Sequence, residues 1–161
     1  MTSDNQTDGQ VAARQIEYSM VSLRPATRAD LRAICAIDQS SFTQPWQPHT
    51  FEQALNDAKY IVLVAQSNEI VCGFGVAYTV GDEGEIATFA VDEAMRGQGV
   101  GDAIFKELMA QCTARGAQQV FLEVRQSNQS AQRLYKRFGF EVVGQRHNYY
   151  SDGETALIMK R

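Results

Sequence analysis

Residues 96–101, Arg-Gly-Gln-Gly-Val-Gly, lie between an apolar, strand-like run, Ile86–Val91, and an amphipathic run, Val100–Arg115. Three glycines within five positions allow the backbone to come close to a ligand. The first amides of a helix have no partner inside the helix and lie at the positive end of its dipole. A strand, a glycine loop and a helix in this order therefore predict a cradle for a diphosphate.

The spacing of the glycines separates this loop from two other phosphate-binding motifs. A dinucleotide fingerprint needs Gly-x-Gly-x-x-Gly, whereas Asp102 occupies the third glycine position here. A P-loop ends in Gly-Lys-Ser/Thr, whereas Gly101 is followed by Asp102 and Ala103. Arg96-x-x-Gly99-x-Gly101 instead resembles the Arg/Gln-x-x-Gly-x-Gly/Ala signature of the GNAT acetyltransferases, whose loop holds the pyrophosphate of acetyl-CoA. A glycine-rich turn without a ligand is the alternative, because short motifs recur by chance.

A second segment, residues 122–140, resembles the next strand and helix of the same family. Its start, Leu-Glu-Val-Arg-x-Ser-Asn, is also typical of the RimI branch, the N-terminal alanine acetyltransferases of ribosomal proteins. Further matches are Phe89-Ala90-Val91 before the glycine loop, Pro45-Trp46 with Phe51 in the substrate-side loop, and Asn148-Tyr149-Tyr150 with residues 153–159 in a C-terminal hairpin. The resemblance covers roughly residues 20–160 in one register, so the chain is identified as a member of the GNAT family.

Acetyl transfer from a thioester to an amine defines what the site residues must do. The amine must be neutral, and an α-amino group, with a pKa near ~8 against ~10.4 for lysine, needs less help. A base must accept its proton, backbone donors must stabilise the oxyanion, and the leaving thiolate needs a proton. The resemblance implies that Glu123 is the base, acting through water, and that Tyr135 protonates the thiolate.

These residues also have purely structural interpretations. Glu123 lies inside a short strand that we expect to be buried, and its carboxylate could instead form a salt bridge with Arg125 or Arg24. Tyr135 could place its ring in the core and its hydroxyl at the surface. His147 competes as the base, although the role of a partly satisfied strand histidine suits it better.

The resemblance also implies that acetyl-CoA is the co-substrate, without a metal. The main chain of Phe89, Ala90 and Val91 would bond the pantetheine arm, on a strand that splays from the next one. Asn128 would contact the CoA arm and cap the following helix, and Arg96 would neutralise phosphate unless it is a solvated surface arginine. An acid at position 102 cannot contact phosphate favourably, so we expect its side chain to point to solvent. The pyrophosphate donors would be Gly97, Gln98, Gly99, Val100, Gly101 and Asp102.

The pocket for the acceptor is expected at three aromatic residues, Trp46, Tyr149 and Tyr150. Buried aromatic residues usually belong to the core, but a tryptophan on a proline-flanked loop is less easily explained that way. The acidic turn at residues 82–85 is either solvated or attracts a basic peptide. The loop at 41–44 is longer than the compact form of some RimI members, which leaves the shape of the pocket open.

The composition limits the class of protein and its partners. The chain has 161 residues, which suggests one domain, with 44% hydrophobic and 21% charged residues, as in ordinary globular proteins. A net charge of −4 argues against direct nucleic-acid binding but allows a basic peptide as substrate. Three separated cysteines and two histidines favour neither a disulfide framework nor a zinc site. With no membrane-spanning run and no signal peptide, we expect a cytoplasmic protein, monomeric or weakly dimeric.

The hydrophobic periodicity predicts a mixed α/β fold, and the resemblance implies the GNAT acyl-CoA N-acyltransferase fold, with about seven strands in a central mixed sheet and about four flanking helices. We expect a mobile polar tail at residues 1–18 and a single domain at 19–161. Gly73 and Gly75 mark a bulge or a close approach of two elements. The expected strands are 19–24, 60–65, 70–80, 85–91, 120–124, 140–149 and 156–159, and the expected helices are 31–38, 50–57, 100–115 and, after a cap at Ser127 or Asn128, up to Arg137.

Three functions are compatible with these residues. The first is acetylation of a protein N-terminus, which the RimI resemblance assigns to the alanine of a small-subunit ribosomal protein. The second is acetylation of a small-molecule amine by a GNAT enzyme, and the fold cannot separate the two because one fold hosts many substrates. The third is a CoA-binding regulatory subunit without turnover, against which the presence of Glu123, Asn128 and Tyr135 weighs.

Overall fold

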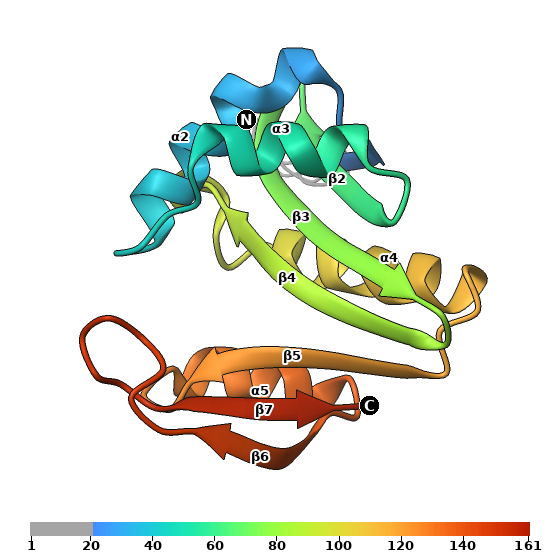
Figure 1. Ribbon diagram of the computed structural model, residues 1–161. Helices are drawn as coiled ribbons and strands as arrows, with labels where there is room; N and C mark the ends of the chain where they lie inside the picture. Colours follow the sequence, from blue (N-terminus) through green and yellow to red (C-terminus); the bar gives the residue numbers. More distant parts are fainter. Residues whose placement is uncertain (1–20) are drawn as a thin grey trace, which may run out of the picture.

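The computed structural model describes residues 21–161, which form a seven-stranded sheet with helices on both faces (Figure 1). The strands are β1 Val21–Pro25, β2 Tyr60–Ser67, β3 Ile70–Val80, β4 Glu83–Val91, β5 Gln119–Arg125, β6 Glu141–Arg146 and β7 Ala156–Lys160. Their order is β1-β2-β3-β4-β5-β7-β6, so the last strand of the chain inserts between β5 and β6. The predicted tail, and residues 19–20 of the predicted first strand, lie outside the described residues.

Four α-helices occur in the predicted order within the described residues. The helices and short 3-10 turns are η1 Arg28–Asp30, α2 Leu31–Ser41, α3 Pro48–Asn56, η2 Glu93–Met95, α4 Val100–Ala114 and α5 Gln129–Arg137. Thr27 is the N-cap of η1, where the Asp30 carboxylate accepts the Thr27 N–H at 2.7 Å, and α2 follows directly. Helix α3 begins two residues earlier than predicted because Pro48 occupies its first turn, where neither its missing N–H nor its fixed φ disturbs a helix.

The predicted strand 140–149 is too long at its C-terminal end, because β6 ends at Arg146. Asn148 has φ +52°, a left-handed conformation that asparagine tolerates better than most residues and that turns the chain out of the sheet. Tyr149 and Tyr150 therefore lie in the loop between β6 and β7 rather than in a strand. This loop returns to β7, the direct neighbour of β5.

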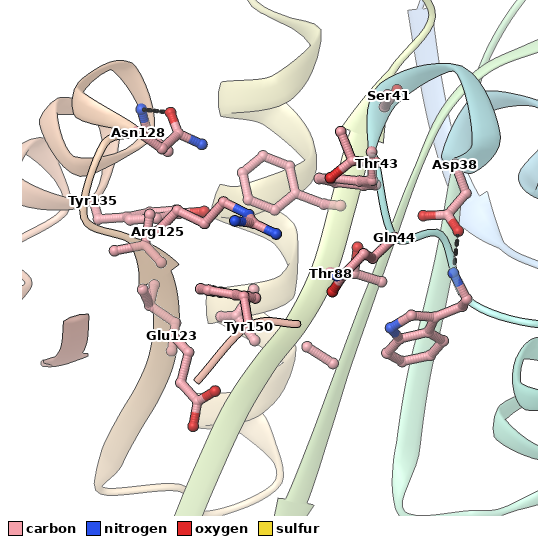
Figure 2. Close-up of a pocket in the computed structure, with 18 residues that line it drawn as sticks. Asp38, Ser41, Thr43, Gln44, Thr88, Glu123, Arg125, Asn128, Tyr135 and Tyr150 are labelled. Carbon is pink, nitrogen blue, oxygen red and sulfur yellow. Dashed lines mark hydrogen bonds between the residues drawn. The ribbon is translucent and has the colours of Figure 1, made fainter. Parts of the chain in front are cut away.

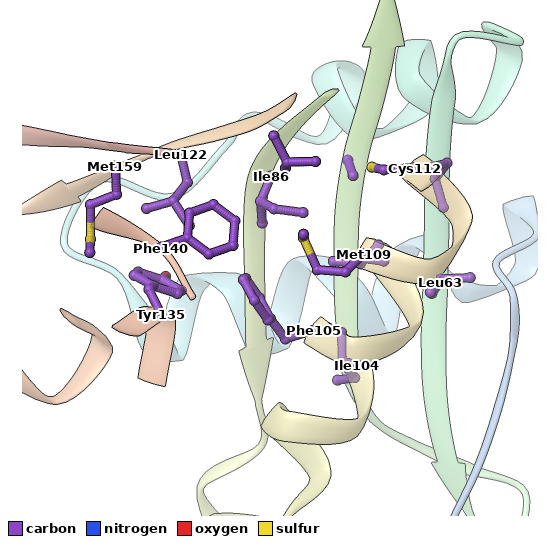
Figure 3. Packing of buried hydrophobic residues seen from close by; sticks show 14 of the residues in the cluster. Leu63, Ile86, Ile104, Phe105, Met109, Cys112, Leu122, Tyr135, Phe140 and Met159 are labelled. Carbon is purple, nitrogen blue, oxygen red and sulfur yellow. The ribbon is translucent and has the colours of Figure 1, made fainter. Parts of the chain in front are cut away.

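Each face of the sheet carries its own hydrophobic core because side chains alternate along the strands. On β2, Ile61 and Leu63 belong to the core under α4, whereas Val62 and Val64 belong to the core under α2 and α3. Figure 3 shows the first of these cores, in which side chains of α4 meet those of β4, β5, α5 and β7. This core joins the two parts of the sheet behind the site described below.

Gly73 and Gly75 allow α4 to pack closely on β3. A Cβ atom at Gly73 would lie 2.8 Å from Ile104 Cδ1. At Gly75 it would lie 2.6 Å from Ile104 Cγ2 and 2.8 Å from Leu108 Cδ1. Real Cβ atoms do not come so close to another side chain, so the close approach expected from the two glycines is confirmed.

Strands β4 and β5 run parallel and pair only from Glu83–Gln119 to Ile86–Leu122. Beyond this ladder the register of β4 with β3 skips Ala87, and such a bulge bends the strand that carries it. Figure 1 shows that β4 and β5 then diverge towards their C-terminal ends. Each strand leads directly to elements that carry predicted site residues, since β4 precedes the glycine loop and α4 while β5 precedes α5.

Candidate active site

A cavity of about 480 Å³ lies where β4 and β5 have separated. Its walls come from the C-terminal end of α2 and the loop after it, from β4, β5 and α5, and from the β6–β7 loop. Gln44 Nε2 donates a hydrogen bond to Ser151 Oγ, which joins the α2–α3 loop to the β6–β7 loop. Of the predicted site residues, Trp46, Phe89, Glu123, Asn128, Tyr135 and Tyr150 line this cavity (Figure 2).

The Glu123 carboxylate faces the cavity from β5, as an acceptor of the amine proton must. Its side chain is 26% exposed and its Oε1 lies 3.2 Å from Arg146 Nε. The strand predicted to be buried alternates between buried positions, which include Leu122 and Val124, and half-buried positions, one of which is Glu123. The salt bridges considered from the sequence do not form, since Arg24 pairs with Asp30 and Arg125 pairs with residues of the β6–β7 loop.

Tyr149 interacts with Glu123 from outside the cavity. The residue is 47% exposed. Hydrogen bonding to the Glu123 carboxylate, and then burial, raise the pKa of Tyr149 to about 12. The hydroxyl therefore stays protonated at neutral pH and is a donor for the carboxylate. Tyr149 thus lies beside Glu123 and is not among the residues that line the cavity, and its predicted contact with the acceptor stays a prediction.

The ring of Tyr135 packs in the core, and the residue also lines the cavity. The residue is 8% exposed, and its ring lies 5.3 Å from the ring of Phe105 and 6.2 Å from that of Phe89, measured between centroids. Burial, followed by the charge of Tyr150, raises the pKa of Tyr135 well above that of a free tyrosine. The hydroxyl, which Figure 2 shows directed between β4 and β5, is therefore a proton donor rather than a phenolate.

Asn128 is the N-cap of α5. Its Oδ1 accepts the N–H of Ala131 at 3.1 Å, which decides between the two caps considered from the sequence. Ser127 instead donates its hydroxyl to Glu154 at 3.0 Å. The side-chain amide of Asn128 keeps its N–H donors for other partners, so capping leaves room for the contact with the CoA arm that the resemblance implies.

The glycine loop does not line the cavity but begins α4 at the end of β4. Gly97 and Gly99 have φ of +75° and +82°, and nothing lies within 4 Å of a Cβ atom built on either. Gly101 differs, since its Cβ would make ordinary contacts with Val91 at 3.6 Å and Phe89 at 3.9 Å. The loop thus has left-handed turns, open space in front of it and unpaired helix amides behind it, which fits a phosphate cradle.

Two charged residues beside the loop have partners within the described residues. Arg96 donates from Nε to the Val91 carbonyl at 3.0 Å and from Nη2 to Ser41 Oγ at 3.2 Å, and so ties the loop to α2. Asp102 is exposed, as expected from its charge. Its carboxylate also pairs with Arg137 Nη2 at 3.1 Å, which connects the start of α4 with the end of α5.

The edge of β4 that faces β5 is unpaired beyond Ile86 among the described strands. The opposite edge of β4 is paired with β3: Phe89 pairs with Gly75, Ala90 with Phe74 and Val91 with Gly73. Ala90 and Val91 do not line the cavity with their side chains. On the open edge the Val91 carbonyl accepts the Arg96 Nε–H, and the remaining main-chain groups there are available to a ligand with alternating donors and acceptors.

Two loops provide the aromatic residues on the acceptor side. The Trp46 ring packs on Phe51 with a centroid distance of 5.0 Å, so it is partly a core residue. The Tyr150 ring lies under the Arg125 guanidinium, 3.9 Å from its carbon. Arg125 also donates to Asp152 at 2.8 Å and to Glu154 at 3.1 Å, which fixes the β6–β7 loop against β5.

The sequence reasoning missed Asp38 and the positioning role of Arg125. Asp38 lines the cavity although it is 1% exposed, and the only signal was a carboxylate in the otherwise apolar stripe of α2. Arg125 lies inside the segment 122–140 that resembles GNAT enzymes, but the sequence indicated only a possible salt bridge with Glu123 for it. Its real partners lie 27 and 29 residues further along the chain, where no local pattern points to them.

A second cavity of about 260 Å³ lies on the other side of Glu123, where β4 and β5 are still paired. Its walls include Glu83, Glu85, Arg146 and Tyr78, whose hydroxyl bonds the Glu85 carboxylate. Two glutamates of the acidic turn, Glu83 and Glu85, therefore line this second cavity, which forms a recess beside Glu123. His147 is exposed, with its ring 3.5 Å from the Thr155 hydroxyl, and lines neither cavity.

In the part of the chain that the structure describes, no three His, Cys, Asp or Glu residues are grouped so that they could hold a metal ion. None of the helices between residues 21 and 161 is long and apolar enough to cross a membrane.

Comparisons with known proteins agree with this geometry. The ribosomal protein bS18-alanine N-acetyltransferase of Haemophilus ducreyi is 37% identical over 136 residues, which cover 81% of this chain and 92% of the relative. The enzyme of the same name from Escherichia coli K12 is 35% identical over 133 residues, covering 81% and 89%. A crystal structure of the ribosomal-protein-S18-alanine N-acetyltransferase from Escherichia coli has a TM-score of 0.81 at 33% identity and covers 88% of this chain and 92% of that chain.

The mixed sheet, opened between two parallel strands over a cavity with a carboxylate and a tyrosine, is that of an acyltransferase. The model of the acetyltransferase (GNAT) family matches residues 31–140, and the chain belongs to this family. It is an N-acetyltransferase, and the acetyltransferases of this family use acetyl-CoA.

Proposed function

We propose that the protein transfers an acetyl group from acetyl-CoA directly to the N-terminal α-amino group of a protein. The observation that carries the proposal is that Glu123 on β5 and Tyr135 on α5 line one cavity. A carboxylate that accepts a proton and a hydroxyl that remains protonated supply the two proton transfers of the reaction.

When bound, acetyl-CoA supplies the acetyl group as a thioester. Glu123 accepts a proton from the acceptor ammonium through water, which leaves the nitrogen lone pair free to form the new amide bond. Main-chain N–H groups on the open edge of β4 stabilise the developing oxyanion. As the carbon–sulfur bond breaks, Tyr135 donates its proton to the sulfur of the leaving group, and the second proton that the nitrogen loses as the amide forms returns through water to the tyrosine oxygen.

The residues present fit this co-substrate. The open edge of β4, residues 87–91, offers main-chain groups to the pantetheine arm, with Asn128 on the opposite wall. Residues 97–102 offer amides at the start of α4 to the pyrophosphate. Arg96 is engaged with the main chain of Val91 and with Ser41, so its proposed role is to hold the loop in place as well as to offset phosphate charge.

The proposed acceptor is an N-terminal alanine, in particular that of a small-subunit ribosomal protein. Two relatives that match most of this chain are named for the alanine of ribosomal protein bS18. Trp46 and Tyr150 line the cavity with large aromatic rings, which suits a small first residue. The recess beside Glu83 and Glu85 gives this side a negative charge, which suits the basic character of a protein that binds RNA.

Mass spectrometry tests the acceptor. The protein is incubated with acetyl-CoA and a peptide library varied at positions one and two, and we expect acetylation at free N-termini that begin with alanine. The control is the same peptide with a blocked N-terminus and a free lysine. Equal acetylation of the blocked peptide would exclude N-terminal specificity, and acetylation of small amines alone would favour a small-molecule acetyltransferase. Binding of acetyl-CoA without any product would favour a regulatory subunit.

A further inference from the structure

Asp38, in the last turns of α2, fixes the loop that carries Trp46. Its Oδ2 accepts the main-chain N–H of Trp46 at 2.7 Å, a hydrogen bond to a carboxylate and therefore one of the stronger kind. The residue is 1% exposed and lines the cavity between β4 and β5. The buried carboxylate of Asp38 thus holds the backbone of Trp46 in place.

The other oxygen of Asp38, Oδ1, has no hydrogen-bond partner among the described residues and is closed to solvent. A buried carboxylate oxygen without a donor is costly, and such a group calls for an explanation. Figure 2 shows this oxygen directed away from Trp46, towards the side of the cavity where Gln44 and Thr88 lie. Burial raises the pKa of Asp38, and no cation of the described residues pairs with it.

We propose that the acceptor peptide displaces the side chains that close off Oδ1 of Asp38, and that this oxygen then accepts a hydrogen bond from a main-chain N–H of the peptide. This inference rests on the proposed protein acceptor. Asp38 would then hold the Trp46 wall with one oxygen and the peptide with the other, as a specificity-determining residue for an acceptor that has peptide N–H groups.

The place of Asp38 separates this contact from the reacting amine. Asp38 belongs to α2, which packs against β3 and β4, whereas Glu123 belongs to β5, on the other side of β4 from β3. An acceptor whose amine lies at Glu123 therefore meets Asp38 with a later part of the chain. A peptide can satisfy both groups at once, but a small amine without amide N–H groups cannot satisfy Asp38.

Replacing Asp38 with asparagine separates the two bonds of the carboxylate. In Asp38→Asn the amide oxygen can still accept the Trp46 N–H, and the NH₂ group then faces the cavity. An acceptor of hydrogen bonds becomes a donor at the position of Oδ1 while the loop stays in place. Asp38→Ala removes both bonds, and Asp57→Asn, an exposed aspartate, is the matched control.

Trp46 is the only tryptophan of the chain, so its fluorescence reports the loop and the binding of a peptide without tryptophan. The probe is an alanine-initiated hexapeptide amide, titrated into the full chain in the presence of CoA. We expect Asp38→Asn to keep the emission maximum and the CoA affinity of the parent protein and to raise the Kd of the peptide about 10- to 100-fold. Asp38→Ala should also shift the emission maximum.

The outcomes separate this inference from the proposed function. If Asp38→Asn binds the peptide as the parent protein does while Asp38→Ala does not, Asp38 only holds the loop and the proposed contact is wrong. If Asp38→Asn weakens a small amine acceptor as much as the peptide, the contact is not with a peptide N–H and is equally wrong. If the parent protein binds no peptide but acetylates small amines, the proposed function fails first.

Discussion

The Tyr135 side chain belongs to two environments, since its ring packs in the core and its hydroxyl reaches the cavity. Tyr135→Phe keeps the ring and removes only the proposed proton donor. We expect kcat to fall by roughly 10²-fold or more, with little change in the KM for acetyl-CoA, because the loss lies in the chemical step. Steady-state kinetics measures both values, and thermal unfolding checks the fold. A kcat close to that of the parent protein would assign the protonation to water or to another group.

Glu123→Gln keeps the size of the side chain but removes its ability to accept a proton. An α-amino group with a pKa near ~8 is mostly protonated below neutral pH, so it depends most on a base there. We therefore expect the loss of rate to be largest at low pH and to shrink as pH rises and the neutral amine becomes abundant. The pH profile of kcat/KM measures this, with Glu141→Gln on exposed β6 as control. A loss by the same factor at every pH would remove Glu123 from the role of base.

At the scale of elements, the start of α4 depends on a left-handed residue at Gly99. Gly99→Asn allows the backbone conformation, because asparagine tolerates positive φ, but places a side chain in the open space before the loop. We expect isothermal calorimetry to show acetyl-CoA binding weakened at least tenfold, with a small change in Tm. Gly116→Asn is the matched control, since Gly116 has φ +95° and similar open space at the other end of α4. Equal affinity in both variants would place the pyrophosphate elsewhere.

The close packing of α4 on β3 at Gly75 also stabilises the fold at the scale of elements. Gly75→Ala would place a methyl group 2.6 Å from Ile104 Cγ2, inside a packed core, so the helix has to move. Overpacking of this kind costs about 1–3 kcal/mol of unfolding free energy. Gly144→Ala on β6 meets only Ile158 at 3.6 Å and should cost less. Denaturant unfolding of the two variants measures the difference, and equal stability would mean that α4 adjusts freely.

At the scale of the whole molecule, the sheet consists of two parts that share a short ladder between β4 and β5. Acetyl-CoA in the proposed position contacts both parts, β4 and α4 on one side and α5 on the other. A ligand at 100 times its Kd stabilises the folded protein by about 2.7 kcal/mol. We therefore expect Tm to rise by roughly 5–10 °C in calorimetry. Adenosine 3′,5′-bisphosphate at the same concentration lacks the pantetheine arm, and an equal rise of Tm with this ligand would contradict binding across both parts.

Features that depend on residues close together in the chain could be predicted from the sequence, whereas features that depend on long-range contacts could not. The elements and a cap at Ser127 or Asn128 depend on residues a few positions apart, so periodicity and capping patterns predicted them, and the structure decides for Asn128. The pairing of Arg146 with Glu123 and the position of β7 between β5 and β6 depend on strands brought together only by folding. Asp38 was missed for the same reason, because its burial depends on the packing of α2 against β3 and β4. The resemblance to GNAT enzymes supplied the roles of Glu123 and Tyr135, which no local pattern could provide.

The open edge of β4 that follows the bulge at Ala87 determines which changes in this strand the protein tolerates over evolutionary time. An open strand edge offers the same amide groups whatever its side chains are, so substitutions along residues 87–91 are restrained by packing and little by the proposed cofactor arm. Loss or gain of one residue in β4 is a different event, because it turns every following amide to the opposite edge of the strand. In a collection of descendants of this gene, we therefore expect β4 to drift in composition while keeping its length.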